Sequence, residues 1–365
     1  MSVRTAYLDW NATAPVLPEV AEAMAEALAL CGNPSSVHRW GRAARQAVEA
    51  ARAEVAALAG VSPDDVIFTS GGSEANHLAL RGIDAPKFVS AIEHDSVLAA
   101  APEATRIPVQ TDGLVDLAAL EAMLEDGALV SLMHANNETG VIQPVAAAAR
   151  LVHARGGLLH SDAVQSAGKL PLDRRALGAD LMTLSAHKIG GPQGVGALIA
   201  APDLALQPLI TGGGQERGRR AGTENVAGIV GFGVAARLAR ARLGQAAGVA
   251  ALRDEAEAHM LAAVPARIFG VGAPRLANTL CIAMPGVAAA TQVMALDLAG
   301  VMVSAGAACS SGKVRRSHVL AAMGAGDDAD CAIRVSLGWS TTAAEIDRLV
   351  EAWAALYARS RVNAA

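Results

Sequence analysis

Short apolar runs alternate with longer Ala-rich stretches through the first two thirds of the chain. The apolar runs lie at residues 66–69, 87–91, 129–133, 158–160, 181–184 and 195–200. Most of the stretches between them are long enough to form a helix. Strands and helices that alternate in this way are typical of a mainly parallel sheet with helices on both faces. The pattern therefore predicts an α/β fold for this part of the chain.

Helical patterns flank this region and continue beyond it. They lie at residues 18–30, 42–60, 226–242 and about 343–358. The second of these ends on Gly60, a residue type that is common at helix C-termini. After residue 242 the chain shows a second strand–helix–strand pattern, which predicts a further, smaller region.

One uncharged segment, residues 276–296, has to be checked as a membrane span. An Asn, a Gln and the pair Pro285-Gly286 interrupt it. The interruptions favour a buried strand at residues 279–284, a Pro-Gly turn and then a helix. We therefore expect no membrane-spanning segment and no membrane partner.

Composition and charge narrow the class of protein. The length of 365 residues fits two domains or one large one at roughly 150 residues per domain, and 52% are apolar, which excludes a disordered chain. The formal net charge is -5 without a basic face, so we expect no nucleic-acid partner. Residues 1–7 lack the apolar core of a secretory signal, so a cytoplasmic location is expected. The four Cys form no CxxC pair and no zinc spacing, and no metal site is predicted.

Lysine is scarce, which limits the candidates for imine chemistry. Among the 30 basic residues, an amine is carried only by Lys87, Lys169, Lys188 and Lys313. Lys188 follows an apolar run and precedes a Gly-Gly-Pro turn, whereas the other three have turn-like or charged neighbours. We therefore expect Lys188 alone to be embedded among apolar and small residues. An amine in such surroundings can have a depressed pKa and act as a nucleophile.

Three further patterns each have a functional interpretation and a structural alternative. The turn Ser70-Gly71-Gly72-Ser73-Glu74 lies between a strand and a helix, and it suits a phosphate or serves as an ordinary connector. Asp162 ends a buried run, where it could hold the protonated pyridine nitrogen of pyridoxal phosphate (PLP) or cap a helix. Arg334 lies in an apolar strand and could bind a substrate carboxylate or form an internal salt bridge.

The cysteines differ in their sequence surroundings. Cys309 follows a run of small residues that we expect to form an exposed, mobile loop, and basic residues after it would favour the thiolate. Cys281 and Cys331 are interpreted as buried small apolar residues, and Cys31 is not assigned.

These motifs have a common source. They include Tyr7-Leu8-Asp9, Phe68-Thr69-Ser70-Gly71, Glu93-His94, Asn136-Asn137-Glu138-Thr139-Gly140, Ser161-Asp162-Ala163-Val164-Gln165, Ser185-Ala186-His187-Lys188, Gly212-Gly213-Gly214-Gln215-Glu216-Arg217-Gly218 and Gly222-Thr223. From about residue 6 to 357, in this order, they resemble the NifS/IscS-type cysteine desulfurases. These belong to the class V aminotransferase group of fold-type-I PLP enzymes. The cysteine loop, Ser-x-Gly-x-Ala-Cys, separates them from a related type with an Arg-x-Gly-His-x-Cys loop.

The resemblance implies a fold and a domain division. A large PLP-binding domain over residues 15–250 would hold a mainly parallel sheet of the seven-stranded type, covered by helices. A smaller α+β domain would comprise residues 1–14 and 251–365 and carry the cysteine loop.

The resemblance also assigns roles around the cofactor. Lys188 would attach to PLP, Asp162 would pair with its pyridine nitrogen, and Gln165 would hydrogen-bond its ring oxygen. His94 would stack on the ring and could shuttle protons. The phosphate would be held by Gly72, Ser73, Ser185 and His187.

Further implied roles concern the substrate and the partners. Asn137 and Arg334 would bind the substrate carboxylate, with Asn11 near the substrate. Cys309 would accept the sulfur of L-cysteine as a persulfide, release L-alanine and pass the sulfur to an acceptor protein such as an iron–sulfur scaffold. Thr223 would reach the phosphate of the other subunit's cofactor, which implies a homodimer with shared active sites.

Some positions depart from the family pattern. Trp10 and Trp339 stand where smaller, polar or charged residues are usual, and Arg315-Arg316 replaces a frequent Glu-Pro. These departures bear on docking to a standard iron–sulfur scaffold and not on the chemistry. The acceptor could equally belong to tRNA thiolation or to another cofactor pathway.

Two alternative functions use the same fold. An aminotransferase, or a selenocysteine or cystine lyase, would have no need of Cys309 in a flexible loop. A catalytically inactive partner subunit would be expected to lack Lys188, Cys309 or Asp162, and all three are present.

Overall fold

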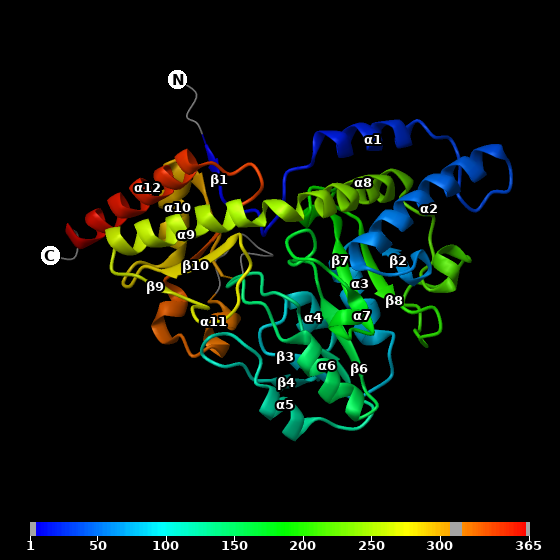
Figure 1. Cartoon of the computed structure of the whole chain (residues 1–365), viewed down its shortest axis with the longest axis horizontal. Coiled ribbons are helices and arrows are strands. Elements are labelled where there is room, and N and C mark those ends of the chain that lie inside the picture. Colours follow the sequence, from blue (N-terminus) through cyan, green and yellow to red (C-terminus); the bar gives the residue numbers. More distant parts are fainter. Residues whose placement is uncertain (1–4, 307–315, 363–365) are drawn as a thin grey trace.

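The computed structural model describes residues 5–306 and 316–362 (Figure 1). Within them the largest sheet has seven strands in the order β2-β8-β7-β6-β5-β3-β4. Its strands are β2 (Val66–Thr69), β3 (Lys87–Ser90), β4 (Thr105–Ile107), β5 (Leu129–Ser131), β6 (Leu158–Asp162), β7 (Leu181–Ser185) and β8 (Gly196–Ala200). In this sheet β8 is antiparallel to both β2 and β7, and the other neighbours are parallel. The mainly parallel sheet expected from the sequence is confirmed.

Helices cover both faces of the sheet because successive strand residues point to opposite sides. Met182 belongs to the apolar cluster on one face, whereas Leu181 next to it belongs to the cluster on the other. The helices of the large sheet are α1 (Pro18–Leu28), α2 (Arg39–Ala59), α3 (Gly72–Arg81), α4 (Asp95–Ala100), α5 (Leu117–Met123), α6 (Val145–Ala154), α7 (Arg174–Leu177) and α8 (Val226–Arg242). The face with Leu181 packs on α3 and α4, and the opposite face packs on α2, α5, α6 and α8, with α1 lying against α8.

The rest of the described chain forms a smaller α+β region. Its strands are β1 (Ala6–Tyr7), β9 (Arg267–Ile268), β10 (Thr279–Ala283), β11 (Val301–Met302) and β12 (Ala332–Ser336), and its helices are α9 (Ala246–Ala263), α10 (Ala289–Leu298), α11 (His318–Ala322) and α12 (Ala343–Val362). Strand β1 pairs in parallel with β11, and β12, β10 and β9 form an antiparallel sheet in that order. Leu8 is buried in one cluster with Ile333 and Trp353, so the N-terminal segment completes a core built by the C-terminal part.

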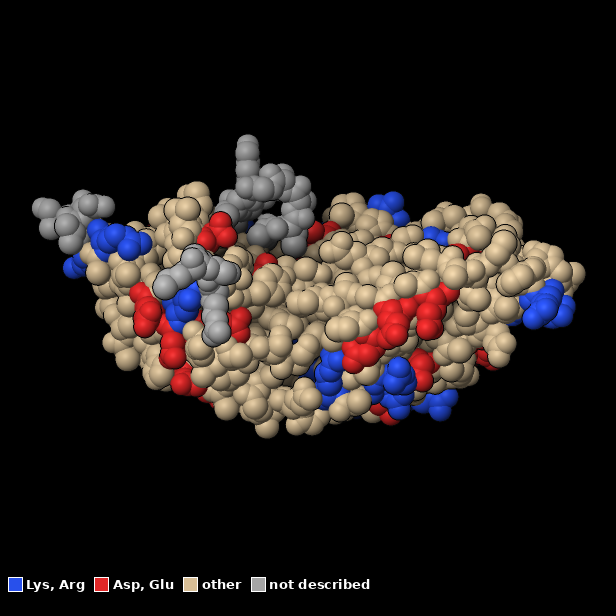
Figure 2. Space-filling model, turned by 90° about the horizontal axis from the view of Figure 1, so that it is seen from above, with Lys and Arg blue, Asp and Glu red and all other residues tan. Residues whose placement is uncertain are grey.

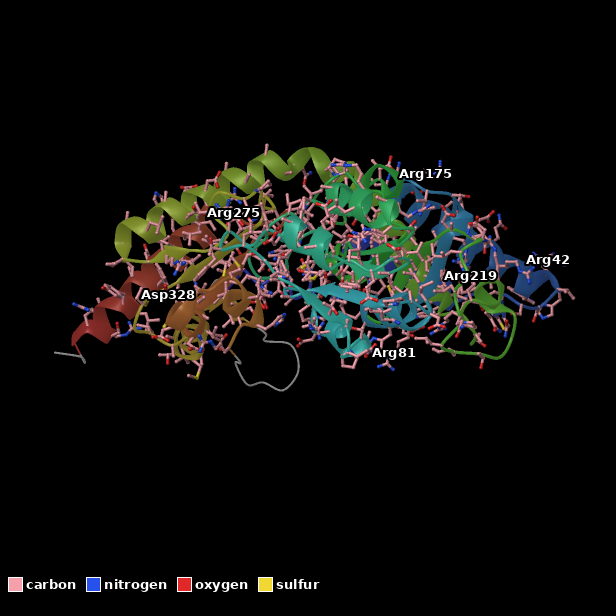
Figure 3. The ribbon with its side chains drawn as sticks, turned by 90° about the horizontal axis from the view of Figure 1, so that it is seen from below. Arg42, Arg81, Arg175, Arg219, Arg275 and Asp328 are labelled. Atoms are coloured by element: carbon pink, nitrogen blue, oxygen red, sulfur yellow. The ribbon has the colours of Figure 1, made fainter. Side chains whose placement is uncertain are left out.

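The two regions are connected along one side of the molecule. Helices α8 and α9 follow each other from the large sheet to the C-terminal region, with one turn, Leu243–Gln245, between them (Figure 1). Figure 3 shows Arg275 and Asp328 toward one end of the molecule and Arg42 and Arg219 toward the other. On the face seen in Figure 2, Lys and Arg side chains form small separate groups and no continuous basic surface. Among the described helices, none combines the length and apolarity needed to cross a membrane.

Candidate active site

The candidate site lies along one edge of the large sheet, where the carboxyl ends of its parallel strands meet. Asp162 is the last residue of β6, and Ser185 is the last residue of β7. Lys188 ends the one-turn helix Ala186–Lys188 that follows β7. His94 follows β3, and Asn137 follows β5. The parallel strands bring these residues, which are distant in the sequence, to the same edge of the sheet. This edge is where open α/β sheets bind their ligands.

The residues expected to hold a phosphate surround one cavity. Gly72, Ser73, Ser185 and His187 line this space of about 520 Å³ at the start of α3. A Cβ added at Gly72 would lie 3.1 Å from Val164 Cγ2, so a larger residue would press on the segment after β6. Unpaired backbone N–H groups at a helix start and serine hydroxyls together favour an anion. Thr223 lines a neighbouring cavity with Ser70 and is not part of this lining within the one chain.

His187 is neutral at physiological pH. Its Nδ1 lies 3.2 Å from Thr13 Oγ1. Burial, and then the positive charge of Lys188, lower the pKa of His187 to about 4. The imidazole can therefore act as a neutral donor to a phosphate without adding charge to the cavity.

A chain of hydrogen bonds connects Asp162 to His94. Asn76 Nδ2 donates to Asp162 Oδ2 at 2.8 Å and to Ser96 Oγ at 2.9 Å. Ser96 Oγ lies 2.7 Å from His94 Nδ1, and the backbone N–H of Val164 donates to Asp162 Oδ1 at 2.9 Å. The Asp162 carboxylate is thereby fixed at both oxygens. Sequence reasoning assigned no role to Asn76 or Ser96, although both stand next to motifs that it singled out.

The pKa of His94 is lowered from its usual value. Burial is the main cause, and the Lys188 charge acts in the same direction, while Asp162 opposes both. His94 is thus available at neutral pH as a neutral imidazole, the form that accepts a proton.

The backbone of Asn11 is the point where the lysine and glutamine meet. Lys188 Nζ donates to the carbonyl oxygens of Asn11 and Ala12 at 2.6 and 2.7 Å. Gln165 Nε2 donates to the same Asn11 oxygen at 2.9 Å. The structure therefore places Lys188, Gln165 and Asn11 in direct contact.

One expectation about the lysines is wrong. Lys169 does lie in a turn, but its side chain is directed inward, and Nζ donates to Asn11 Oδ1 at 2.8 Å and to Gln165 Oε1 at 3.0 Å. Burial lowers the pKa of Lys169 well below its usual value, and the charges of Lys188 and Arg334 lower it further. Lys188 is therefore not the only sheltered amine. The sequence around Lys169 could not predict its burial, because a turn residue can direct its side chain either into the protein or into solvent.

Arg334 and Asn137 meet as well, but in an arrangement that includes an internal ion pair. Arg334 Nη1 donates to the Asn137 carbonyl oxygen at 3.1 Å, and Nη2 donates to Asp9 Oδ1 at 2.6 Å. Within the described residues, Arg334 Nε has no hydrogen-bond partner. The internal salt bridge considered from the sequence is therefore present.

Glu93 is a buried carboxyl group that precedes His94. Its Oε1 accepts the Met133 N–H at 2.6 Å, and among the described residues no partner reaches Oε2. Burial, reinforced by the negative charge of Asp162, raises the pKa of Glu93 to about 8. This residue was noted in the sequence only as part of a motif.

The cysteines are placed as follows. Cys309 lies outside the described residues. Cys281 is buried, as expected, and its burial raises the pKa of its thiol. Cys331 is only partly buried, which corrects the prediction of a buried apolar residue. It lies directly before β12 and packs at the edge of an apolar cluster. Cys31 is exposed.

The two unusual tryptophans pack against each other beside the lysines. Their rings meet edge to face, with centroids 4.6 Å apart and planes at 72°. The Arg242 guanidinium lies 4.7 Å from the Trp339 ring centre. Trp10 and Trp339 line a cleft that is also lined by Lys169 and Lys188.

A mainly parallel sheet with a lysine, a fixed aspartate and an anion cavity at one edge defines a class of α/β enzyme, and comparison with known proteins specifies it. The family model of the aminotransferase class-V proteins matches residues 6–349, so the chain belongs to that family. A cysteine desulfurase of Cereibacter sphaeroides is 48% identical over 364 residues, which cover 94% of each protein. Cysteine desulfurase IscS 1 of Archaeoglobus fulgidus is 40% identical over 94% of this chain and 95% of its own length.

Solved structures agree. A NifS-like protein of Rickettsia africae superposes with a TM-score of 0.92 at 36% identity, covering 97% of this chain and all of the other. Within the aminotransferase class-V family, the chain is thus one of the NifS/IscS-type cysteine desulfurases, as the sequence motifs indicated.

Proposed function

We propose that this protein is a PLP-dependent cysteine desulfurase that converts L-cysteine to L-alanine and leaves the sulfur on Cys309 as a persulfide. The observation that carries the proposal is the hydrogen-bonded chain Asp162–Asn76–Ser96–His94 next to Lys188, at the edge of a class-V aminotransferase sheet. Relatives named cysteine desulfurase match over nearly the whole length. The aminotransferase and lyase alternatives are not favoured by these names.

The residues present fit PLP. The cavity lined by Gly72, Ser73, Ser185 and His187 offers backbone and hydroxyl donors to a phosphate. Asp162 presents a carboxylate that is held by two donors and suits a protonated pyridine nitrogen. We propose that Lys188 attaches to PLP and that Gln165 donates to its ring oxygen.

The chain's own residues would orient the substrate and move its protons. When bound, PLP supplies an electron sink for the electron pair released at the substrate α-carbon. Arg334 and Asn137 would hold the substrate carboxylate, with Asn11 beside it. His94, neutral at physiological pH, would accept a proton at one ring nitrogen and return it later in the cycle.

Sulfur transfer needs no added oxidant or reductant. The Cys309 thiolate would attack the substrate sulfur, so that a sulfur–sulfur bond forms while the carbon–sulfur bond breaks. The electron pair left on carbon takes up a proton, which completes alanine. Overall, L-cysteine and the Cys309 thiol give L-alanine and the Cys309 persulfide, and an acceptor protein such as an iron–sulfur scaffold would then remove the sulfur.

The domain division is part of the proposal. Residues 15–250 would form the large domain, and residues 1–14 with 251–365 would form the small one, which carries Cys309. The apolar clusters support this, because Leu8 is buried with C-terminal residues and not with the large sheet.

We also propose a homodimer in which Thr223 reaches the phosphate of the partner's cofactor. The position of Thr223 beside the phosphate cavity and outside its lining supports this.

The deciding experiment gives PLP-loaded protein L-cysteine and measures alanine, together with the mass of each cysteine-containing peptide. The wild-type protein should form alanine and carry one extra sulfur on the peptide with Cys309. Cys309→Ser should still bind PLP and should lose alanine formation, because a hydroxyl is a poor nucleophile toward a thiol sulfur. Cys31→Ser, at an exposed position, is the matched control and should retain activity. Full alanine formation by Cys309→Ser would favour a lyase instead.

A further inference from the structure

Lys169 makes two contacts that the proposed chemistry does not use. The turn that carries it lies between the bridged residues Ala167 and Leu170. A Cβ at Gly168 would lie 2.9 Å from Ala239 Cβ, so glycine lets the turn approach α8 closely. From there Nζ reaches Asn11 Oδ1 at 2.8 Å and Gln165 Oε1 at 3.0 Å. A lysine in a turn usually extends its amine into solvent, whereas the Lys169 amine is buried between two amide oxygens.

The surroundings favour an uncharged amine. Within the described part of the chain, the charged groups that act on Lys169 are the cations Lys188 and Arg334, and no carboxylate pairs with its amine. An uncharged amine has two N–H groups, and the two amide oxygens take both. Both contacts are therefore complete without the third proton that the charged ammonium form carries.

The two amides differ in how much they depend on this lysine. The Asn11 side chain has further partners, since Asn278 Nδ2 donates to its Oδ1 at 3.0 Å and its Nδ2 donates to Thr279 Oγ1 at 2.9 Å. For Gln165 Oε1, Lys169 is the donor that the described structure provides. Gln165 Nε2 donates one of its two N–H groups to the Asn11 carbonyl, and the second N–H is available to another acceptor. Loss of Lys169 would thus free the Gln165 amide and leave the Asn11 side chain fixed.

We propose that Lys169 is a positioning residue that holds Gln165 Oε1 so that the second N–H of Nε2 is presented to the ring oxygen of the bound cofactor. This inference rests on the proposed function only through PLP binding. A fixed donor stabilises the anionic form of the ring oxygen. Without this donor the ring oxygen would be more basic, and its protonated form would persist to a higher pH.

The test follows the visible absorption of PLP-loaded protein as a function of pH, without cysteine. In Lys169→Met the midpoint of the absorbance transition should rise by on the order of one pH unit. The PLP dissociation constant of the apoprotein should rise by about twofold to tenfold, the value of one hydrogen bond. The other titratable groups at the site, Asp162, His94 and His187, are unchanged in this variant.

Two comparisons separate positioning from other effects. Lys87→Met removes a lysine whose Nζ donates to the Ala85 carbonyl at 3.0 Å, and this variant should leave the midpoint unchanged. In a Gln165→Leu background, Lys169→Met should add no further shift, because its effect passes through Gln165. An equal shift in that background would mean a direct charge effect and would overturn the proposal.

Folding and function are controlled independently. The thermal midpoint of each apoprotein shows whether the variant is folded. If Lys169→Met is unfolded, Lys169→Gln takes its place in the test. Its side chain stays polar but cannot reach both oxygens, so it should show the same upward shift of the absorbance midpoint. An unchanged absorbance midpoint in either folded variant overturns the positioning role. A wild-type protein that binds PLP but does not turn over cysteine would refute the proposed function alone.

Discussion

Glu93 shows how a single buried residue ties the site to the stability of the fold. Its carboxyl group has one backbone donor and no partner at Oε2 within the described chain, and Asp162 lies near enough to repel its charge. The folded protein therefore favours the protonated form of Glu93. Neutral Glu93 next to neutral His94 keeps the protein side of the site low in charge around Asp162.

The raised pKa of Glu93 predicts a pH-dependent stability. The group titrates near 4.5 when unfolded and at about 8 when folded, so its contribution is present below pH 4.5 and is lost as the pH rises toward 8. Glu93→Gln removes the titration and should gain on the wild type by on the order of a few kcal/mol across this range. Denaturant unfolding of the apoprotein between pH 5 and about 8 measures it. The exposed Glu121→Gln is the control, and parallel curves for Glu93→Gln and the wild type would contradict the assignment.

Sequence order predicted some site residues and not their partners. Asp162 and Lys188 follow apolar runs, and strand ends of a parallel sheet meet at one edge, so their placement there could be predicted. The partner of Arg334 is Asp9, which lies 325 positions earlier in the chain, and no local pattern indicates it. The direction of the Lys169 side chain is set by a close turn against α8, which is a tertiary effect. Contacts over such separations depend on packing that one sequence does not display.

At the scale of elements, long periodic or apolar segments were predicted well. The helix expected at 226–242 is α8, and the run at 66–69 is β2. The helix expected from 42 begins at Arg39, because His38 caps it by accepting the Gly41 N–H. Strands such as β9 and β11 have two residues each and are defined by pairing to neighbours, so they carry no pattern of their own.

The segment after β12 depends on a glycine that lies against the N-terminal segment. A Cβ at Gly338 would lie 2.0–2.2 Å from atoms of the Trp10 ring, which is rigid and packed on Trp339. Trp10 Nε1 also donates to the Tyr7 carbonyl at 3.0 Å, so the ring cannot move without losing this bond. Gly338 therefore allows the two ends of the small region to pack together.

Gly338→Ala should lower the free energy of unfolding by about 1–3 kcal/mol, because the added methyl group overpacks this contact. Gly248→Ala is the matched control, since Gly248 lies in α9 with open space around it and should gain roughly 0.5–1 kcal/mol. Denaturant unfolding of both apoproteins tests the pair. Equal stability of Gly338→Ala and the wild type would mean that the Trp10 ring is free to move.

At the scale of the whole molecule, apolar side chains are exposed where α1 connects to α2. Leu28, Val37 and Trp40 are 75%, 84% and 55% exposed. Pro34 of the same connection lines a cavity with Gly214 and Glu224, next to Thr223. A surface of this kind is typical of an interface. The proposed dimer would cover the connection and bring the Thr223 loop to the partner's cofactor.

This arrangement predicts that Trp40→Glu weakens the dimer. A carboxylate buried between subunits without a partner is unfavourable, and a loss of only about 1.4 kcal/mol already raises the dimer dissociation constant tenfold. Sedimentation of PLP-loaded protein at a series of concentrations measures the constant. Leu298→Glu, at a position 90% exposed on α10, is the control and should leave it unchanged. Because Thr223 would act across the interface, Trp40→Glu should also bind PLP more weakly at concentrations where it is monomeric and regain affinity where it associates. A monomeric wild-type protein, or a Trp40→Glu dimer as stable as the wild type, would remove this surface from the interface.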